Sequence, residues 1–377
     1  MTSDNELLYL EFRKRFPILR QKVYLNSCSQ GALSEDVENA LSEFNQSWHR
    51  EGSPWDRWIE VQEDLRREFA LMIGAEPDEV AITFSASSGI SSIASALNFA
   101  RRPGVLLGQL EFPTMSHIWL AQVPRGARVT WVPSREGTSS PEDYRALAGG
   151  DTLIIPATHV CFRSGFRNDA AGIAKAAHDA GAYFMLDDYQ SCGTRPVDVR
   201  GIQADFYVAG ALKYLLGTAG VGFLFVRRDV IRTLLPTVTG WFAQSEPFAF
   251  DSMHHNPAST AARFQSGTPP VMAAYAALAG IRLLRDLGLS KVESRIAQLT
   301  RRFIAGAVAR GWKLKTPLDS DGPLVVIELA EAARIAGMLS ERQIIVSTRD
   351  DGLRVSFHAY NTSGDADTLL DALERLI

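Results

Sequence analysis

The sequence predicts an α/β protein, in which a mostly parallel, doubly wound sheet forms a large domain and a smaller α+β domain follows it. Short apolar segments rich in β-branched residues recur between residues 80 and 226, and most of them are apolar on both faces. Helical patterns separate several of these segments, as expected when helices connect parallel strands and cover both faces of the sheet. Beyond the stretch HHNPAST (254–260) the pattern changes to long helices and then to shorter strands.

The large domain begins with an amphipathic helix. Apolar residues recur every three to four positions from Trp58 to Met72, and Gly74 is a typical helix end. VAITF (80–84) is then a short buried strand, and the serines among residues 85–88 are typical N-cap residues for the next helix. A helical segment is also predicted over 169–180. The further strand patterns are VLLG (105–108), VTWV (129–132), TLIIPA (152–157), AYFML (182–186), DFYVA (205–209) and GVGFLFV (220–226).

The C-terminal part begins with a long helix over 271–287, which Gly288 ends, and a second helix runs through the 290s. The strand and helix patterns that follow are PLVVIEL (323–329), a helix, QIIVS (343–347), LRVSF (353–357) and a terminal helix from Asp365. We therefore predict that residues 21–257 form the large domain, and that residues 1–20 and 258–377 form the small domain.

Composition narrows the class of protein. The formal net charge is −4, so no basic surface indicates a nucleic acid or an anionic membrane as partner. No apolar run approaches the roughly 20 residues that span a bilayer, and the acidic start MTSDNELLYLEF lacks the features of a secretory signal. Three cysteines do not make a disulfide framework and lack metal-ligand spacing. We expect a cytoplasmic protein without a metal site.

A lysine and a carboxylate follow two of the predicted strands. Asp187 comes directly after AYFML, and Lys213 lies four residues beyond DFYVA. Ligands bind outside the carboxyl ends of the strands in a doubly wound sheet, so both side chains can meet in one crevice. Pyridoxal 5′-phosphate (PLP) needs such a pair, because an amine forms an imine with its aldehyde and a carboxylate keeps its ring nitrogen protonated. The spacing alone leaves open that Asp187 only caps a strand and that Lys213 is a surface residue.

Further motifs strengthen this interpretation. The chain resembles the class V (fold-type I) PLP-dependent aminotransferase superfamily over nearly its whole length, and within it the kynureninase and epimerase-like branch. The segments that carry the resemblance, in the family's order and spacing, are VYLNSCSQGALS (23–34), EFPT (111–114), HVCFRSG (159–165), RFQSGTPPV (263–271) and LRVSFHAYN (353–361).

The resemblance implies roles for the residues nearest the cofactor. Lys213 would carry the cofactor as an imine and then act as general base and acid at the substrate's α-carbon. Asp187 would pair with the pyridinium nitrogen, and Gln190 would hydrogen-bond near the imine or the ring hydroxyl. Phe112 takes the position whose ring stacks on the cofactor.

Ser87, Ser88 and Gly89 open a helix directly after a strand, where backbone N–H groups and the helix dipole suit a phosphate. The alternative is that the serines only cap the helix. The resemblance also implies that Thr268 and Trp241 reach the phosphate of a neighbouring subunit, so that the active unit is a homodimer with sites at its interface. For Trp241, packing in the core is the alternative.

Three residues are candidates for substrate binding. Arg354 heads a late strand and would hold the α-carboxylate of an amino acid in a bidentate pair; a salt bridge at the rim is the alternative. Asn26 and Ser27, in the entry loop 23–34, are also expected to contact the substrate.

Some residues depart from the family's branches. No cysteine follows Cys192, so the persulfide chemistry of a cysteine desulfurase by a C-terminal cysteine is not expected. Kynureninases carry a histidine at the position of Gln190 and a tyrosine at that of Leu212, and leucine can neither bind phosphate nor transfer a proton.

The resemblance therefore implies a PLP-dependent transferase or lyase that acts at the α-carbon or Cβ of an amino acid, by transamination or β-lyase chemistry. A kynureninase-like hydrolase, an epimerase and a non-catalytic PLP-fold binding protein are the alternatives. A dinucleotide-dependent oxidoreductase is disfavoured because no G-x-G-x-x-G opens the first strand–helix turn.

Overall fold

A seven-stranded sheet in the order β2-β8-β7-β6-β5-β3-β4 forms the centre of the computed structural model, which describes residues 4–377. Strands β3 to β7 run parallel, and β8 runs antiparallel to both of its neighbours, β2 and β7. The predicted parallel-dominated sheet is confirmed. The bounds are β2 (Val80–Thr83), β3 (Gly104–Gly108), β4 (Arg128–Val132), β5 (Thr152–Thr158), β6 (Tyr183–Asp187), β7 (Phe206–Gly210) and β8 (Gly222–Val226).

The reversal of β8 has a local cause. Residues 211–221 connect it to β7, and this link is too short for the crossover that a parallel strand needs, which takes about a dozen residues or more. The chain therefore turns at the carboxyl end of β7 and returns antiparallel. Lys213 lies in this turn.

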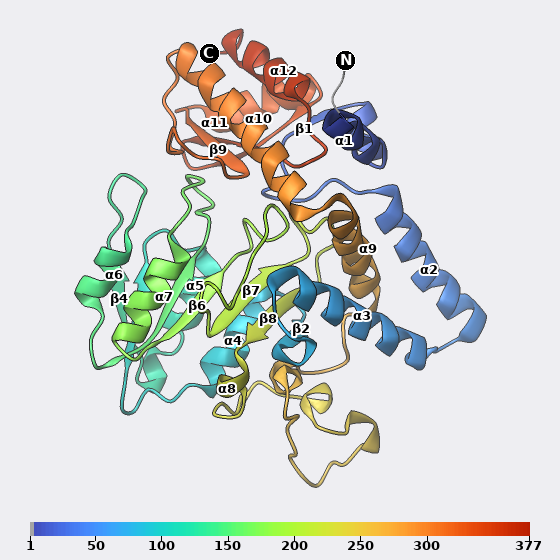
Figure 1. Ribbon diagram of the computed structural model, residues 1–377, viewed down its shortest axis with the longest axis vertical. Coiled ribbons are helices and arrows are strands. Elements are labelled where there is room, and N and C mark those ends of the chain that lie inside the picture. Colours follow the sequence, from blue (N-terminus) through green and yellow to red (C-terminus); the bar gives the residue numbers. More distant parts are fainter. Residues whose placement is uncertain (1–3) are drawn as a thin grey trace.

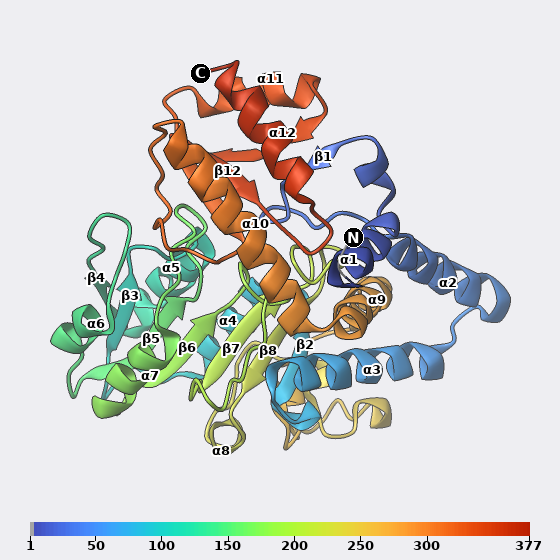
Figure 2. The ribbon, with the colours of Figure 1, turned by 45° about the horizontal axis from the view of Figure 1, so that its top comes forward.

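Two hydrophobic layers cover the sheet, because successive side chains of a strand point to opposite faces. Tyr207 and Ala209 face one layer, and Phe206 and Val208 face the other. Figures 1 and 2 show helices on both sides. The first layer packs against α3 (Trp55–Ile73), α7 (Ala170–Asp179) and α9 (Val271–Leu287). The second packs against α4 (Ala86–Ala96), α5 (Pro113–Leu120) and α8 (Arg228–Ile231).

A smaller unit lies above this sheet in Figure 1. Its antiparallel sheet has the order β11-β12-β9, and a separate pair joins β1 to β10 in parallel. The strands are β1 (Val23–Tyr24), β9 (Leu324–Glu328), β10 (Ile344–Ile345), β11 (Ser347–Arg349) and β12 (Gly352–Ser356). The helices packed there are α10 (Leu289–Ala309), α11 (Ala332–Glu341) and α12 (Ser363–Glu374). The predicted α+β character of this part is confirmed.

The division of the chain at residue 258 stays a prediction. Helix α9 packs along α3 and α2 (Glu35–Glu51), where Tyr275 meets Phe44 and Trp58. Strand β1, which lies inside the predicted large domain, pairs with β10 of the small unit. These contacts favour a boundary near Gly288 and assign the segment 23–27 to the small unit.

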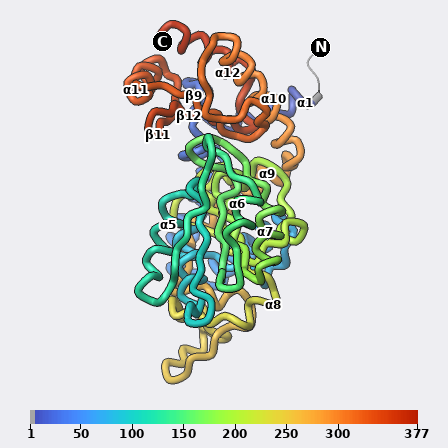
Figure 3. The backbone as a smooth tube through the Cα atoms, turned by 90° about the vertical axis from the view of Figure 1, so that its left-hand side faces the viewer, coloured from blue at the N-terminus to red at the C-terminus, as the bar shows by residue number. Residues whose placement is uncertain are grey.

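The remaining elements are helices α1 (Asp4–Lys14) and α6 (Pro141–Leu147) and six short 3₁₀ turns within the described residues, which are Pro17–Arg20, Pro77–Glu79, Val123–Arg125, Trp241–Ala243, Pro247–Ala249 and Ala261–Phe264. The segment 236–260 projects from the sheet at the end opposite the small unit, at the bottom of Figure 3. Phe250 and Met253 are 73% and 83% exposed there.

Within residues 4–377, no helix combines the length and the apolar character needed to cross a membrane. The cysteines Cys28, Cys161 and Cys192 are buried and unbridged.

Candidate active site

Lys213 lies at the carboxyl edge of the sheet, between two aromatic rings. Its Nζ is 4.5 Å from the ring centroid of Tyr189 and 5.7 Å from that of Phe112. Burial lowers the pKa of Lys213 to about 8, although the nearby Cys28 and Asp187 raise it. A substantial fraction of the amine is therefore neutral in the physiological range, which a nucleophile or a general base requires.

Asp187 ends β6, the strand next to β7, and its side chain is nearly free of protein partners. It is 7% exposed, and Oδ1 accepts one hydrogen bond, 3.0 Å from the backbone N of Tyr189. No cation of the described chain lies within salt-bridge distance of it. Burial raises the pKa of Asp187 to about 6, and the Lys213 ammonium opposes this rise. A cationic ring nitrogen would favour the ionised carboxylate here.

The neighbouring carboxylate, Asp188, is fully used by the protein. It accepts hydrogen bonds from Ser191 Oγ at 2.6 Å and Tyr207 OH at 2.7 Å, and His159 Nδ1 lies 2.7 Å away. Asp188 therefore holds the strand ends together through these partners. Asp187, which lacks such partners, is the carboxylate that remains available to a ligand.

Two acceptors near the crevice lack a donor. Gln190 Nε2 donates to the carbonyl of Cys28 at 3.2 Å, but Gln190 Oε1 is buried without a partner among residues 4–377. Asn26 Oδ1 is in the same condition. A buried acceptor without a donor costs about 1–3 kcal/mol, so both positions fit a ligand that supplies a hydrogen.

Helix α4 begins at this edge of the sheet. Its N-cap is Ser85, whose Oγ accepts from Ser88 N at 3.1 Å and lies 2.8 Å from Ser88 Oγ. The Ser88 hydroxyl is thus used in the N-cap. Ser87 Oγ, by contrast, makes one long hydrogen bond, 3.4 Å, to Thr114 Oγ1. Gly89 is buried against β8, where an added Cβ would be 3.2 Å from Leu224 Cβ. The helix start suits an anion, with Ser87 as the more available hydroxyl.

Phe112 presents an aromatic face to the crevice. It is the residue before α5, and it is 40% exposed although it is a large apolar side chain. Its ring makes an edge contact with Phe162, at 5.0 Å between centroids. An exposed ring fixed on one edge suits a second planar ring stacked on its face.

Arg354, in β12, carries a buried positive charge without an acidic partner. It is 1% exposed and donates to Phe162 O at 3.1 Å, Ser29 Oγ at 2.8 Å and Ser347 Oγ at 3.0 Å. No carboxylate of the described chain forms a salt bridge with it. Burying an unpaired charge is costly, so the site favours an anion brought by a ligand. Arg354 also lowers the pKa of Lys213, which places the two cations within electrostatic reach.

Other predicted residues lie outside the crevice of their own chain. Ser27 is fully buried, and its Oγ lies 2.5 Å from Tyr360 OH, so the structure does not bring this hydroxyl to a substrate. Trp241 packs against Phe250 and Trp55, at 5.9 and 6.4 Å between ring centroids, in the projecting segment. Thr268, which follows the projecting segment in the sequence, is exposed. The cross-subunit roles of Trp241 and Thr268 stay predictions.

Three residues of this site were missed by sequence reasoning. Ser29 and Ser347 orient Arg354 from distant parts of the chain, and no sequence signal joins them. Tyr189 stands between Asp187 and Gln190, so its position in the sequence was the signal that it is part of the site.

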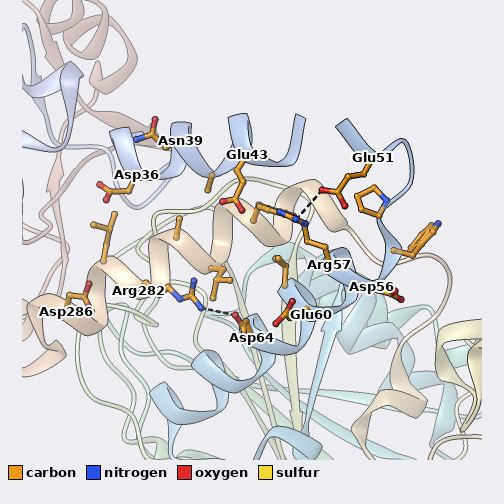
Figure 4. Close-up of a pocket in the computed structure, with 18 of the residues that line it drawn as sticks. Asp36, Asn39, Glu43, Glu51, Asp56, Arg57, Glu60, Asp64, Arg282 and Asp286 are labelled. Carbon is orange, nitrogen blue, oxygen red and sulfur yellow. Dashed lines mark hydrogen bonds and ion pairs between the residues drawn. The ribbon is translucent and has the colours of Figure 1, made fainter. Parts of the chain in front are cut away.

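A separate polar groove of about 980 Å³ lies between α2, α3 and α9 (Figure 4). Acidic side chains line it, and each of its three arginines is paired with one of them: Arg15 with Asp36 at 3.1 Å, Arg57 with Glu51 at 3.1 Å and Arg282 with Asp64 at 3.0 Å. It contains neither a lysine nor any residue of the crevice described above. Nowhere in residues 4–377 do three or more His, Cys, Asp or Glu side chains gather in a way that could hold a metal.

A buried amine and a carboxylate at the carboxyl edge of a wound sheet, with a helix start beside them, define a PLP-dependent enzyme of fold-type I. The family follows from the sequence as a whole. The chain belongs to the class-V aminotransferases, whose family model, "Aminotransferase class-V", matches residues 23–369.

Individual relatives agree. The chain is 34% identical to the "Uncharacterized aminotransferase YcbU" of Bacillus subtilis, over 96% of each chain. It is 28% identical to a kynureninase of Bacillus anthracis, over 93% of this chain and 87% of the relative. Among solved structures, a cysteine desulfurase from Thermococcus onnurineus NA1 superimposes with a TM-score of 0.87 at 21% identity, over 97% of each chain. The cystine C-S lyase C-DES gives 0.88 at 20% identity, over 95% and 98%. The two structures show the shared fold.

The residues present fit the cofactor. Gln190 Oε1 lacks a donor, Asp187 lacks a charged partner, and the start of α4 offers backbone N–H groups for a phosphate. When bound, PLP withdraws electrons from the carbon that bears the substrate's amino group.

Proposed function

We propose that this enzyme acts on an α-amino acid at the α-carbon or Cβ, by transamination or β-lyase chemistry. The observation that carries the proposal is Arg354, a buried guanidinium without a carboxylate partner in the described chain, within electrostatic reach of Lys213. An α-amino acid places a carboxylate one carbon away from its amine, and a site with both groups selects such a molecule.

The chain's own residues then divide the work. Arg354 binds the substrate carboxylate, and its bonds to Ser29 and Ser347 hold the guanidinium plane. Lys213, with a pKa of about 8, accepts and returns the proton at the α-carbon. Asp187 holds a positive charge on the ring nitrogen through its otherwise unpaired carboxylate.

Amino transfer is favoured by the 34% identical relative, which bears the name of an aminotransferase. Hydrolysis of kynurenine is the second candidate, because a kynureninase is 28% identical over most of the chain. Gln190 and Leu212 argue against it, since kynureninases carry histidine and tyrosine there. Epimerisation stays an alternative, because it begins with the same proton removal.

The test is a panel of amino acids added to the PLP-loaded enzyme, with cofactor absorbance and product masses recorded. An α-keto acid together with cofactor left in its amine form would establish transamination. Pyruvate released without loss of the cofactor would establish β-elimination, alanine released from kynurenine would establish the hydrolase, and inversion of the α-carbon alone the epimerase. Lys213→Ala is the control and should give none of these products. The proposal fails if PLP binds to Lys213 and no α-amino acid perturbs its spectrum.

We also infer a homodimer whose active sites lie at the subunit interface. The projecting segment exposes Phe248, Phe250 and Met253, by 49%, 73% and 83%, and such apolar patches are typical of interaction surfaces. We expect Phe250→Asp to shift the sedimentation of the enzyme from dimer to monomer and to weaken PLP binding. The control is Leu318→Asp, at an equally apolar exposed position outside this segment. A wild-type monomer that binds PLP fully would contradict the inference.

A further inference from the structure

Tyr189 occupies space that only a glycine at position 210 leaves open. A Cβ added at Gly210 would lie 2.3 Å from Cε2 and Cζ of Tyr189 and 2.4 Å from its hydroxyl oxygen, closer than real contacts allow. Gly210 does not adopt a positive φ, so its backbone conformation does not require glycine. Glycine is needed here because the ring of Tyr189 lies directly on it.

The contact with Gly210 places the ring of Tyr189 next to the amine of Lys213. Gly210 ends β7, three residues before Lys213, and Tyr189 follows the end of the neighbouring strand β6. Lys213 Nζ lies 4.5 Å from the centroid of the Tyr189 ring, closer than the 5.7 Å that separates it from the Phe112 ring. The backbone N of Tyr189 donates to Asp187 Oδ1. One residue therefore contacts both the amine and the carboxylate.

The phenol group of Tyr189 has no competing task. Its hydroxyl forms no hydrogen bond with the described residues, and burial, with a smaller effect of Asp187, raises its pKa to about 12. The ring therefore stays neutral. The ring lies against Gly210, and its centroid is 4.5 Å from the Nζ of Lys213.

We propose that Tyr189 is a positioning residue, seated on Gly210, whose ring holds the Lys213 amine at the edge of the cofactor site. The inference rests on the role proposed for Lys213. Without the ring, the amine would sample more of the crevice, and fewer encounters with the aldehyde of PLP would lead to a bond.

The first test compares Tyr189→Ala with Tyr189→Phe in the PLP-free enzyme. The readouts are the Kd for PLP and the rate of its attachment, followed by absorbance, with borohydride reduction and peptide mass to confirm the link at Lys213. Losing the ring should weaken binding and slow attachment by about tenfold, because a reacting group displaced by about 1 Å can lose up to about a hundredfold in rate. Tyr189→Phe should stay within about threefold of the wild type, because it keeps the ring. If Tyr189→Ala matches the wild type, or Tyr189→Phe is as defective as Tyr189→Ala, the ring does not position the amine.

The second test uses Gly210. Gly210→Ala should displace the ring and reproduce much of the defect, whereas Gly210→Ala combined with Tyr189→Ala should be no worse than Tyr189→Ala alone. Two independent effects would add instead, and that result would overturn the inference.

A control separates positioning from stability. Tyr183→Ala removes a ring at the opposite end of β6, so it should lower the melting temperature and leave the Kd for PLP unchanged. The wild-type enzyme separates the two proposals: if it does not link PLP through Lys213, the role proposed for Lys213 fails. If it does, and Tyr189→Ala behaves like the wild type, only the inference about Tyr189 fails.

Discussion

Burial acts on Lys213 and Asp187 in opposite directions on the pKa scale, and both shifts favour the neutral form. The pKa of the amine falls to about 8 and that of the carboxyl rises to about 6. In the protein without cofactor, burial therefore destabilises the charged form of each group. A cofactor that brings a cationic ring nitrogen to Asp187 and takes Lys213 into a covalent bond relieves both. The relief of this unfavourable burial therefore adds to the free energy of cofactor binding.

Asp187→Asn tests this cost at a single residue. The folded-state pKa of Asp187 is raised, so the native state binds its proton more tightly than the unfolded chain, and the wild type loses stability as pH rises toward about 6. Above that pH the variant without cofactor should be more stable than the wild type by about 1–3 kcal/mol, and near pH 4 the difference should vanish. Urea denaturation at several pH values measures it. PLP affinity should fall in the same variant, and equal stability at pH 8 would contradict the argument.

Arg354→Lys tests the proposed grip on the substrate. Lysine keeps the positive charge but cannot donate two parallel hydrogen bonds to a carboxylate. The affinity for amino acids, measured by titration of cofactor absorbance, should fall about tenfold or more, since a hydrogen bond to a charged group contributes about 1.5–3 kcal/mol. Binding of PLP and of an amine without a carboxylate should stay unchanged. An equal loss for that amine would mean that the substitution distorts the site.

Among the elements, the link between β7 and β8 matters most for the site, because it carries Lys213 and places it at the carboxyl edge of the sheet. The strand patterns and the rule that ligands bind at carboxyl ends predicted where Asp187 and Lys213 would lie. The reversal of β8 was not predicted, because strand direction depends on the length of the link and not on the composition of the strand. Helix α2 was also missed, although Ser34 caps it and acidic residues fill its first turn.

A substitution at Gly31, in the entry loop, tests how the position of the β7–β8 link affects the site. Its backbone N donates to Leu212 O at 2.9 Å, and an added Cβ would lie 2.3 Å from the carbonyl oxygen of Lys213. Gly31→Ala should therefore push the loop and the link apart and reduce PLP affinity by at least about tenfold, through a backbone shift that costs about 1–3 kcal/mol. Gly337→Ala is the control, since nothing lies within 4 Å of its added Cβ. Unchanged PLP binding by Gly31→Ala would show that the loop yields without moving Lys213.

For the whole molecule, fold class and family could be predicted, but the contacts that complete the site could not. Short apolar strands between helices determine a wound sheet, and five motifs in order indicate the family. The bonds of Arg354 to Ser29 and Ser347, and the seat of Tyr189 on Gly210, depend on packing between segments far apart in the chain. Such contacts follow from tertiary structure, which periodicity does not encode.

Cofactor binding should stabilise the whole fold, because PLP bridges groups that only the native state assembles. At a free concentration one hundred times its Kd, a ligand that binds only the native state adds about 2.7 kcal/mol to the free energy of unfolding. The melting temperature should rise with PLP concentration, and less so in Lys213→Ala, which lacks the covalent bond. A similar rise in both proteins would show that the phosphate and ring contacts carry the affinity.

The entry loop is fastened at both ends of the site. Strand β1 pairs with β10, and Ser356 N donates to Leu25 O at 2.9 Å, whereas Gly31 is bonded to the link that carries Lys213. Arg354, which would bind the substrate carboxylate, thus belongs to the small unit, and its partner Ser29 lies in the loop between the two fastened points. Asp187 and Lys213, which would perform the chemistry, belong to the central sheet and its β7–β8 link. An α-amino acid bound to Arg354 and held at Lys213 would connect the two units through the single carbon between its carboxylate and its amine, so the separation of the two units selects for that spacing.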